Sequence, residues 1–262
     1  MPDRGAAARR RGTDGPTTKD VLALKRMQAV SPHPLIGTDA DELLIERSDF
    51  YVRLASSRGR RSRSSLLIQR MYSWRGYKSS TREDPARRAN QVTLQACHSE
   101  EVFGTLTVNF DSEFGLAADA LYRPEIAAYR SKGACVAELT RLAVDPEHGS
   151  KEVLGALFHL AHMLCVARGV SDVFIEVNPR HTAFYRRMLN FEQVGERRMC
   201  PRVNAPAVLL HVEVAYVTQQ IALYGGHHGR GKRSLYPYFF SPEEQEGIPR
   251  RILGGKGRAR SE

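Results

Sequence analysis

The sequence predicts an α/β domain in which helices flank a mixed central sheet, and three observations support this. Apolar strands are expected at 136–144 and 172–177, with an amphipathic helix at 150–168 between them. That order is typical of a βαβ unit, whose two strands lie parallel. Alternating segments that read as a hairpin precede the unit, and a last long apolar strand is expected at 208–217.

The elements ahead of the βαβ unit are short. Alternation and β-branched residues predict strands at 50–54, 92–96 and 102–110. Four polar residues separate the last two strands, which favours a hairpin. Ser64 or Ser65 would cap a helix that runs through Tyr72, and another short helix is expected around 117–129.

Two residues predict helix ends in the second half of the chain. Gly169 follows the long helix of the βαβ unit, and Asn190 follows a short helix expected at 181–189. Glycine and asparagine are the residues that most readily take the left-handed conformation that ends a helix. We therefore expect both residues in that conformation.

Composition divides the chain into three parts. Residues 1–45 are rich in Arg, Gly and Pro and lack sustained periodicity, so we expect a disordered basic segment. Residues 46–224 would form the folded domain, and 225–262 a basic, mostly disordered tail. The tail contains one aromatic cluster, made of Tyr236, Tyr238, Phe239 and Phe240.

Charge and cysteine content narrow the class of protein. The net charge of +10 favours an acidic partner, and the 42% hydrophobic content is sufficient for a core. The four cysteines form neither a CxxC pair nor a zinc spacing, which indicates reduced thiols. No apolar run is long enough to span a membrane, and the basic N-terminus lacks the apolar core of a signal peptide. We expect a cytoplasmic protein.

Polar residues interrupt the two strands of the βαβ unit. Glu138 and Arg141 lie in the first strand, Glu176 lies in the second, and Asn178 follows it. Buried ionisable groups cost stability unless they are paired, so these positions are candidate site residues. In a regular strand, residues i and i+3 point to opposite faces. If Glu138 and Arg141 share one site, a β-bulge between them is required.

Several segments resemble known acyltransferases. The run 183–191 looks like the A-x-x-Y-x-x-x-G-F segment of GNAT acyltransferases, one residue longer, and 137–145 resembles a strand of the autoinducer synthases. The overall pattern is similar to the N-acyl amino acid synthase family over about 50–222. The segments that carry this similarity are 71–77, 104–107, 138–141, 176–181 and 201–206.

The resemblance implies a GNAT-like acyl-CoA N-acyltransferase fold and an N-acyltransferase activity. A long acyl chain would move from an acyl carrier protein thioester to the amine of a free amino acid. The donor would be phosphopantetheine-linked, and no cofactor would be bound permanently. Thr107 and Ile68 stand where autoinducer synthases carry arginines, so lactone formation is not expected.

The loop after the first strand of the βαβ unit bears on the donor. Coenzyme A-dependent relatives carry a glycine-rich loop here that holds the pyrophosphate on helix-terminal amides. This sequence instead has Asp145-Pro-Glu-His-Gly-Ser-Lys151, with one glycine and two acids. That favours a carrier-protein donor. A coenzyme A-dependent N-acetyltransferase and a non-catalytic nucleic-acid-binding protein remain alternatives, although a nucleic-acid partner is not expected.

Roles follow for the polar residues. We assign catalysis to Glu138, as general base, and to Arg141; the alternative is that these two only pair with each other. Asn178 would bind the substrate, or else cap a helix. Arg180 would clamp the carboxylate of the acceptor, or else be solvated. Thr140 is a further expected substrate contact.

Several aromatic residues and two histidines could have either a functional or a structural role. Trp74 and Tyr72 would line a substrate pocket, or belong to the core. Tyr185 would protonate the leaving thiolate, although we favour a packing role. His159 and His162 have a spacing that suits a metal, but no third ligand is evident, so we expect a structural pair and no metal site.

Arginines dominate the segment before and within the first expected helix. We expect six of them to dock an acidic carrier protein: Arg58, Arg60, Arg61, Arg63, Arg70 and Arg75. Complementary charge raises association rates and fixes orientation. The alternative is a solvated arginine-rich face.

Overall fold

The computed structural model describes residues 43–77, 88–227 and 233–252. Eight strands form one sheet in the order β1-β2-β3-β4-β5-β6-β8-β7. Their bounds are β1 Leu43–Glu46, β2 Tyr51–Leu54, β3 Gln91–His98, β4 Glu101–Phe110, β5 Val136–Val144, β6 Asp172–Val177, β7 Glu192–Cys200 and β8 Ala205–Glu213. Every neighbouring pair is antiparallel except β5 and β6, which are parallel. The predicted mixed sheet and βαβ unit are confirmed.

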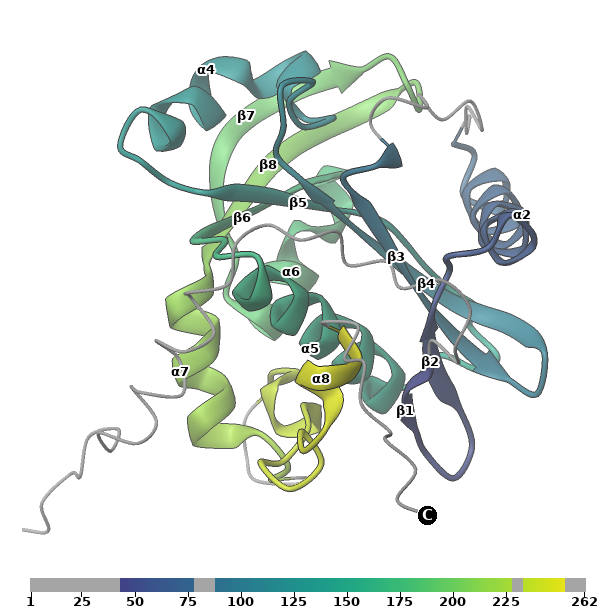
Figure 1. Cartoon of the computed structure of the whole chain (residues 1–262). Helices are drawn as coiled ribbons and strands as arrows, with labels where there is room; N and C mark the ends of the chain where they lie inside the picture. Colours follow the sequence, from purple (N-terminus) through teal and green to yellow (C-terminus); the bar gives the residue numbers. More distant parts are fainter. Residues whose placement is uncertain (1–42, 78–87, 228–232, 253–262) are drawn as a thin grey trace, which may run out of the picture.

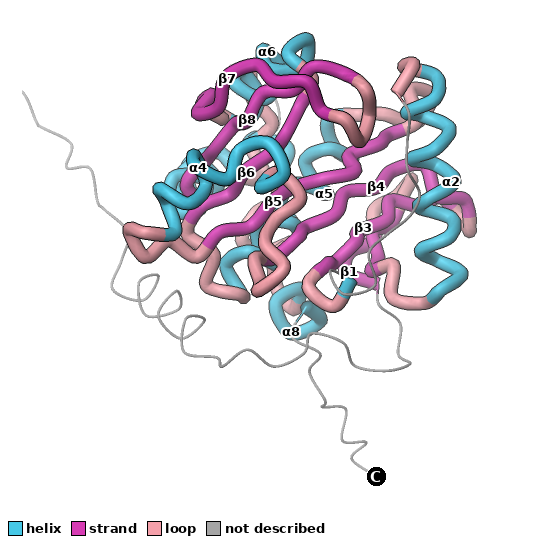
Figure 2. Tube along the Cα trace, turned by 90° about the horizontal axis from the view of Figure 1, so that it is seen from above, coloured by secondary structure: helices cyan, strands magenta, loops and turns pink. Residues whose placement is uncertain are grey.

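Helices cover both faces of the sheet. Their bounds are α2 Arg58–Trp74, α4 Asp119–Arg130, α5 Lys151–Ala167, α6 Thr182–Leu189, α7 Val214–Tyr224 and α8 Ile248–Ile252, with short 3-10 turns η1 Pro179–His181 and η2 Tyr236–Tyr238. Figure 1 shows α2 and α4 above the sheet and α5, α6, α7 and α8 below it. Seen from above, α2 and α4 lie over different strands, with the middle of the sheet between them (Figure 2).

The main core lies on the α5 side of the sheet. Alternate residues of β6, Val173, Ile175 and Val177, enter it, while Phe174 enters a smaller cluster under α4. A third cluster joins α2 to the sheet around Ala143. The helix ends follow the predicted chemistry, since Gly169 and Asn190 have φ of 68° and 58°.

Three elements differ from the sequence expectation. Helix α2 begins at Arg58, because Ser57 rather than Ser64 or Ser65 accepts a hydrogen bond from the Arg60 amide. Strand β7 was not expected; it pairs only with β8, so much of it is exposed and its sequence shows no alternation. The apolar run expected as one strand at 208–217 divides into β8 and the start of α7.

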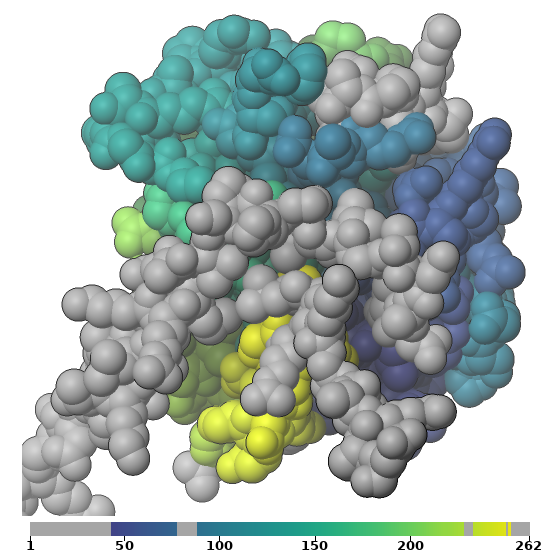
Figure 3. All heavy atoms as spheres, viewed as in Figure 1, coloured from purple at the N-terminus to yellow at the C-terminus, as the bar shows by residue number. Residues whose placement is uncertain are grey.

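The expected ends of the folded domain are also different. Residues 233–252 do not form a loose tail, since Leu235, Tyr236 and Phe240 are fully buried. Gly155 of α5 makes this possible, because a Cβ there would lie 2.6 Å from the Tyr238 carbonyl oxygen. Figure 3 shows this C-terminal segment in yellow at the lower side of the molecule.

The N-terminal boundary moves slightly. Leu43 to Ile45 belong to β1, which α8 contacts from the other end of the chain. The rest of the segment expected to be disordered, 1–42, lies outside the described residues, as does 253–262. In the part of the chain that the structure describes, no helix is long and apolar enough to cross a bilayer.

Candidate active site

Strand β5 carries a β-bulge at Arg141. Thr107 of β4 pairs with Thr140 and Thr105 pairs with Ala143, so one residue of β4 faces two residues of β5. Arg141 takes a left-handed conformation with φ of 56°. The bulge required for Glu138 and Arg141 to share a site is therefore present.

The bulge shifts which β5 side chains face α5. Leu139, before the bulge, and Leu142 and Val144, after it, all pack against the main core. Ala143 instead packs under α2. A regular strand would place Leu139 and Leu142 on opposite faces, so the extra residue keeps the apolar side chains inward.

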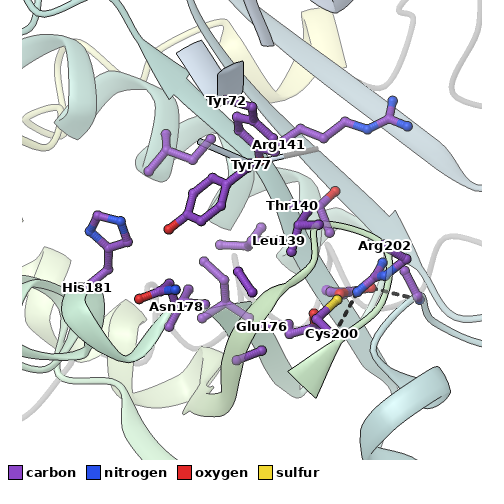
Figure 4. Close-up of a pocket in the computed structure, with 18 of the residues that line it drawn as sticks. Tyr72, Tyr77, Leu139, Thr140, Arg141, Glu176, Asn178, His181, Cys200 and Arg202 are labelled. Carbon is purple, nitrogen blue, oxygen red and sulfur yellow. Dashed lines mark hydrogen bonds and ion pairs between the residues drawn. The ribbon is translucent and has the colours of Figure 1, made fainter. Parts of the chain in front are cut away.

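The two parallel strands separate directly after Glu138. Their register pairs are Val136–Asp172, Ala137–Val173 and Glu138–Phe174, and residues 139–144 have no partner on β6 in the described sheet. A cavity of about 640 Å³ opens between them. Its wall includes residues from β5, β6, α2, α6 and the β7–β8 turn. Ten of the lining residues are labelled in Figure 4.

Glu138 lies fully buried in the wall of this cavity. Its Oε2 accepts hydrogen bonds from the Ala117 amide at 2.9 Å and the Ala118 amide at 3.4 Å. Its Oε1 has no hydrogen-bond partner among the described residues. Burial raises the pKa of Glu138 to about 7, against the lowering effect of the Arg202 charge. Such a carboxyl gains and loses a proton near neutral pH.

An ion pair lies close enough to Glu138 in the cavity wall for its charges to act on the carboxyl. The Arg202 guanidinium contacts the Glu176 carboxylate at 2.7 Å, and both residues line the cavity (Figure 4). Glu176 is held on β6, whereas Arg202 lies in the turn between β7 and β8. The Glu176 charge raises the pKa of Glu138 and the Arg202 charge lowers it. Cys200 lies beside this pair, and burial raises the pKa of its thiol.

Arg202 lies in the segment 201–206 that resembles the family, but the sequence alone assigns it no role. Nothing in its neighbours along the chain marks a site, because the turn reaches Glu176 only after β8 pairs with β6. Along the chain, a site near this turn is indicated only by Glu176, the polar residue that interrupts the apolar strand β6.

The two substrate-binding residues after β6 differ in position. Asn178 lines the cavity and also caps η1, since its Oδ1 accepts from the Arg180 amide at 3.1 Å. Arg180 is not part of the cavity wall in the described chain. Its guanidinium donates to the Tyr77 hydroxyl at 2.6 Å and stacks over that ring. The expected carboxylate clamp by Arg180 is therefore not supported.

Of the residues expected to line a substrate pocket, Tyr72 and Thr140 do so. The Thr140 hydroxyl accepts from the Asn109 amide group at 3.2 Å. Trp74 does not, because it is 69% exposed on the outer side of α2. Tyr185 also lines the cavity, and its ring packs against Phe158, Phe184 and Phe191.

The six expected docking arginines all belong to α2 or its C-cap. Arg63 pairs with Glu100 at 2.9 Å and Arg70 with Asp145 at 2.5 Å, so part of this charge is already paired. Arg75 reaches the cavity wall. The described helix has no acidic residue in its first turn. Several cations thus lie at the positive end of the helix dipole, an arrangement that costs stability.

The two helix histidines belong to the core. The ring of His159 stacks on Phe239 and Phe240 and accepts from the Phe240 amide at 2.9 Å. His162 bonds to the Thr218 hydroxyl at 3.1 Å, and burial lowers its pKa to about 4. Among the described residues no group of His, Cys, Asp and Glu is arranged to hold a metal ion. Three cysteines are buried, and all four are free.

A mixed sheet whose parallel central strands separate beside a bulge, with a buried carboxyl at the opening, defines an acyltransferase of GNAT-like fold. The family model described as "N-acyl amino acid synthase FeeM" matches residues 63–213, more than half of the chain. The chain belongs to this N-acyl amino acid synthase family. No curated protein matches the sequence significantly.

The structure was also compared with solved structures, of which FeeM supports the fold. FeeM, an N-acyl amino acid synthase from uncultured soil microbes, superposes with a TM-score of 0.60 at 24% identity, covering 65% of this chain and 94% of its own. The acyl-homoserine lactone synthase LasI superposes with a TM-score of 0.46 at 12% identity, covering 64% of this chain and 91% of its own. An N-acetyltransferase from Staphylococcus aureus Mu50 superposes with a TM-score of 0.46 at 8% identity, covering 63% of this chain and 98% of its own.

Proposed function

We propose that this protein transfers a long acyl chain from an acyl carrier protein thioester to the amine of a free amino acid. The observation that carries the proposal is Glu138. It is a fully buried carboxyl with a pKa raised to about 7, and its Oε1 is without a hydrogen-bond partner among the described residues. A general base is most effective when its pKa lies near the working pH.

The acceptor amino acid presents an ammonium and a carboxylate. The ammonium fits beside Glu138 and Glu176, the two acids of the cavity wall. The carboxylate fits the Arg202 guanidinium, because arginine binds carboxylates through two parallel hydrogen bonds. Arg202 takes the role that sequence reasoning gave to Arg180, which is instead held by Tyr77.

The proposed reaction is a direct transfer within a complex of both substrates. Glu138 removes a proton from the ammonium, and the free amine attacks the thioester carbonyl carbon. A carbon–nitrogen bond forms, the carbonyl oxygen becomes an oxyanion, and the carbon–sulfur bond then breaks. The carbonyl re-forms as the thiolate leaves, and the thiolate takes up the second proton that the nitrogen gives up when it becomes an amide. Backbone groups of β5 beyond Glu138, which lack a partner on β6 in the described sheet, are available to the oxyanion.

The segment between β5 and α5 supports a carrier-protein donor over coenzyme A. The first turn of α5 is capped by its own Ser150, whose hydroxyl accepts from the Val153 amide at 3.2 Å. Asp145 accepts from the Glu147 amide and pairs with Arg70, so a carboxylate occupies the approach to the helix. A pyrophosphate would meet negative charge where it needs free amides.

Arginine distribution supports an acidic protein as the donor. Ile68 and Tyr72 of α2 and its C-cap residue Arg75 line the cavity, and the same helix carries further arginines toward its N-terminus. A carrier protein that docks along α2 would bring its phosphopantetheine arm to the opening between β5 and β6. The unfavourable cations in the first turns of α2 would then be compensated by the partner's acids.

The test is a purified assay with two matched donors, the same acyl chain on an acyl carrier protein or on coenzyme A. Each donor is combined with a mixture of the twenty amino acids, and N-acyl products are identified by mass spectrometry. We expect product from the carrier-protein donor with a kcat/KM at least tenfold higher than from coenzyme A. Equal or better use of coenzyme A would overturn the donor assignment, and acylation of no amino acid would overturn the acceptor assignment.

A further inference from the structure

A second, smaller cavity adjoins the catalytic cavity. Its volume is about 40 Å³, and it lies among apolar side chains below the sheet. Leu139 of β5 lines both cavities and so stands between them. Protein interiors are otherwise close-packed, and voids of this size are few in one domain.

The two cavities lie in line along the same elements. On α5, Leu154 lines the catalytic cavity, whereas Phe158 and Cys165 line the small one. These residues follow one helical stripe, because the spacings of four and seven return to the same face. On β6, Ile175 lines the first cavity and Val173 the second, two residues apart on one face. The small cavity therefore continues the catalytic cavity beneath the sheet.

Part of the wall of the small cavity comes from the C-terminal segment. Tyr236 and Phe239 line it, and both lie beyond residues 63–213, the part of the chain that the family model matches. The Tyr236 hydroxyl donates to the Leu189 carbonyl at 2.7 Å, which fixes this wall against α6. Three titratable groups belong to the lining. Burial lowers the pKa of His162 to about 4, raises the pKa of the Cys165 thiol to about 12 and raises the pKa of Tyr236, so all three are neutral at physiological pH.

We propose that Tyr236 and Phe239 form the floor of the acyl-chain channel and so set the longest acyl chain that the enzyme accepts. This inference rests on the proposed function. The occupant is the methyl end of a saturated acyl chain, which passes Leu139 from the catalytic cavity. An apolar lining continuous with the thioester site suits hydrocarbon, and the floor is closed by two rings that are at most 1% exposed.

The test compares Phe239→Ala with Phe240→Ala. Both rings are buried in the same segment and stack on His159, at 5.0 and 4.8 Å, but only Phe239 lines the small cavity. Rates are measured with carrier-protein donors of increasing chain length. We expect Phe239→Ala to change the ratio of kcat/KM for long over short chains by at least tenfold in favour of the long chains, since one methylene in an apolar pocket is worth about 10- to 200-fold. Phe240→Ala should keep the wild-type ratio. An unchanged ratio in folded Phe239→Ala would overturn the proposal.

A cavity-filling variant covers the case in which Phe239→Ala does not fold. Ala161 of α5 also lines the small cavity. Ala161→Val removes space there and should lower the preferred chain length. A profile that does not move toward shorter chains would contradict the inference independently of Phe239.

Binding of free saturated fatty acids separates this inference from the proposed function. If the wild-type protein forms no N-acyl product but Phe239→Ala binds longer fatty acids than wild type and Phe240→Ala do, the proposed reaction fails and the floor assignment stands. If products form with one chain-length profile in all three proteins, the reaction stands and the floor assignment fails.

Discussion

Glu138 lies opposite Phe174 in the last register pair that joins β5 to β6. The buried carboxyl is thus placed where the parallel sheet opens, and the next three residues of β5 turn through the bulge at Arg141. The opening between β5 and β6 and the position of the Glu138 carboxyl both follow from one local feature of the backbone, the bulge at Arg141. Substitutions at these positions therefore distinguish effects on the reaction from effects on packing.

Replacement of Glu138 by Gln should abolish the general base and retain the shape of the side chain. We expect kcat to fall by about a hundredfold or more, in line with the usual contribution of a general base. The amides of Ala117 and Ala118 still find an acceptor in the Gln side chain. A fall of less than tenfold, in a variant with the wild-type fold, would show that Glu138 is a structural residue.

The same variant should change how stability depends on pH. Burial raises the pKa of Glu138 from 4.5 to about 7, so the folded protein holds this proton more tightly than the unfolded chain does. Wild-type stability should therefore fall as pH rises from about 4.5 to about 7 and level off above. Glu138→Gln should be more stable than wild type at pH 8 by up to about 3 kcal/mol, and the advantage should shrink toward pH 5. Urea unfolding at both pH values measures this difference, and an advantage that does not depend on pH would contradict it.

The ion pair between Glu176 and Arg202 should set the acidic limb of the rate profile. Because the Arg202 charge lowers the pKa of Glu138, Arg202→Gln should move the rise of kcat/KM to higher pH. Because the Glu176 charge raises that pKa, Glu176→Gln should move the rise to lower pH. The opposite directions are the test. Shifts of the same sign would mean that Glu138 is not the titrating group.

Arg141 allows the backbone and the side chain to be examined separately. A non-glycine residue in the left-handed conformation lowers the stability of the folded state by roughly 1–2 kcal/mol, whereas glycine takes this conformation without that loss. Arg141→Gly and Arg141→Ala both remove the guanidinium, but only the alanine keeps the strain. We expect the glycine variant to be about 1 kcal/mol more stable, with both variants similarly impaired in activity. Equal stability in thermal unfolding would contradict the strained bulge.

The proposed docking of the carrier protein on α2 predicts a salt-sensitive effect on the KM for the donor. Arg58→Gln combined with Arg63→Gln should raise the KM for the acyl carrier protein by about tenfold at low salt and leave the KM for the amino acid unchanged. The difference should shrink as ionic strength rises. Arg123→Gln combined with Arg197→Gln removes the same charge from α4 and β7 and serves as the control. An equal effect of the two pairs would rule out specific docking on α2.

The sequence predicts the elements that have their own periodicity. The βαβ unit, the hairpin and the left-handed ends at Gly169 and Asn190 follow from local patterns, and so does the bulge at Arg141 once Glu138 must share its site. Local patterns do not predict β7, because an exposed strand paired on one side needs no apolar alternation. They also do not reveal that residues 233–252 pack on α5, since this depends on the close approach allowed by Gly155.

Local sequence patterns also predict only part of the site, namely the residues that lie on or next to the two central strands. Glu138, Thr140, Arg141 and Asn178 lie on β5 or directly after β6, where polar residues interrupt apolar strands, and all four line the cavity. Arg202 becomes a neighbour of Glu176 only through the pairing of β8 with β6 and of β7 with β8. Trp74 and Arg180 have suitable chemistry, but the direction of each side chain depends on tertiary contacts: Trp74 is exposed, and Arg180 is bound by Tyr77.

A comparison in living cells asks whether Glu138 serves an N-acyl amino acid synthase. The full chain and its Glu138→Gln variant are expressed in a bacterial host, and mass spectra are taken of the organic extracts at equal levels of soluble protein. The account predicts new N-acyl amino acids in the wild-type extract and their loss in the variant. The same new species in both extracts, or none in the wild-type extract when acyl carrier protein and all amino acids are present, would contradict it.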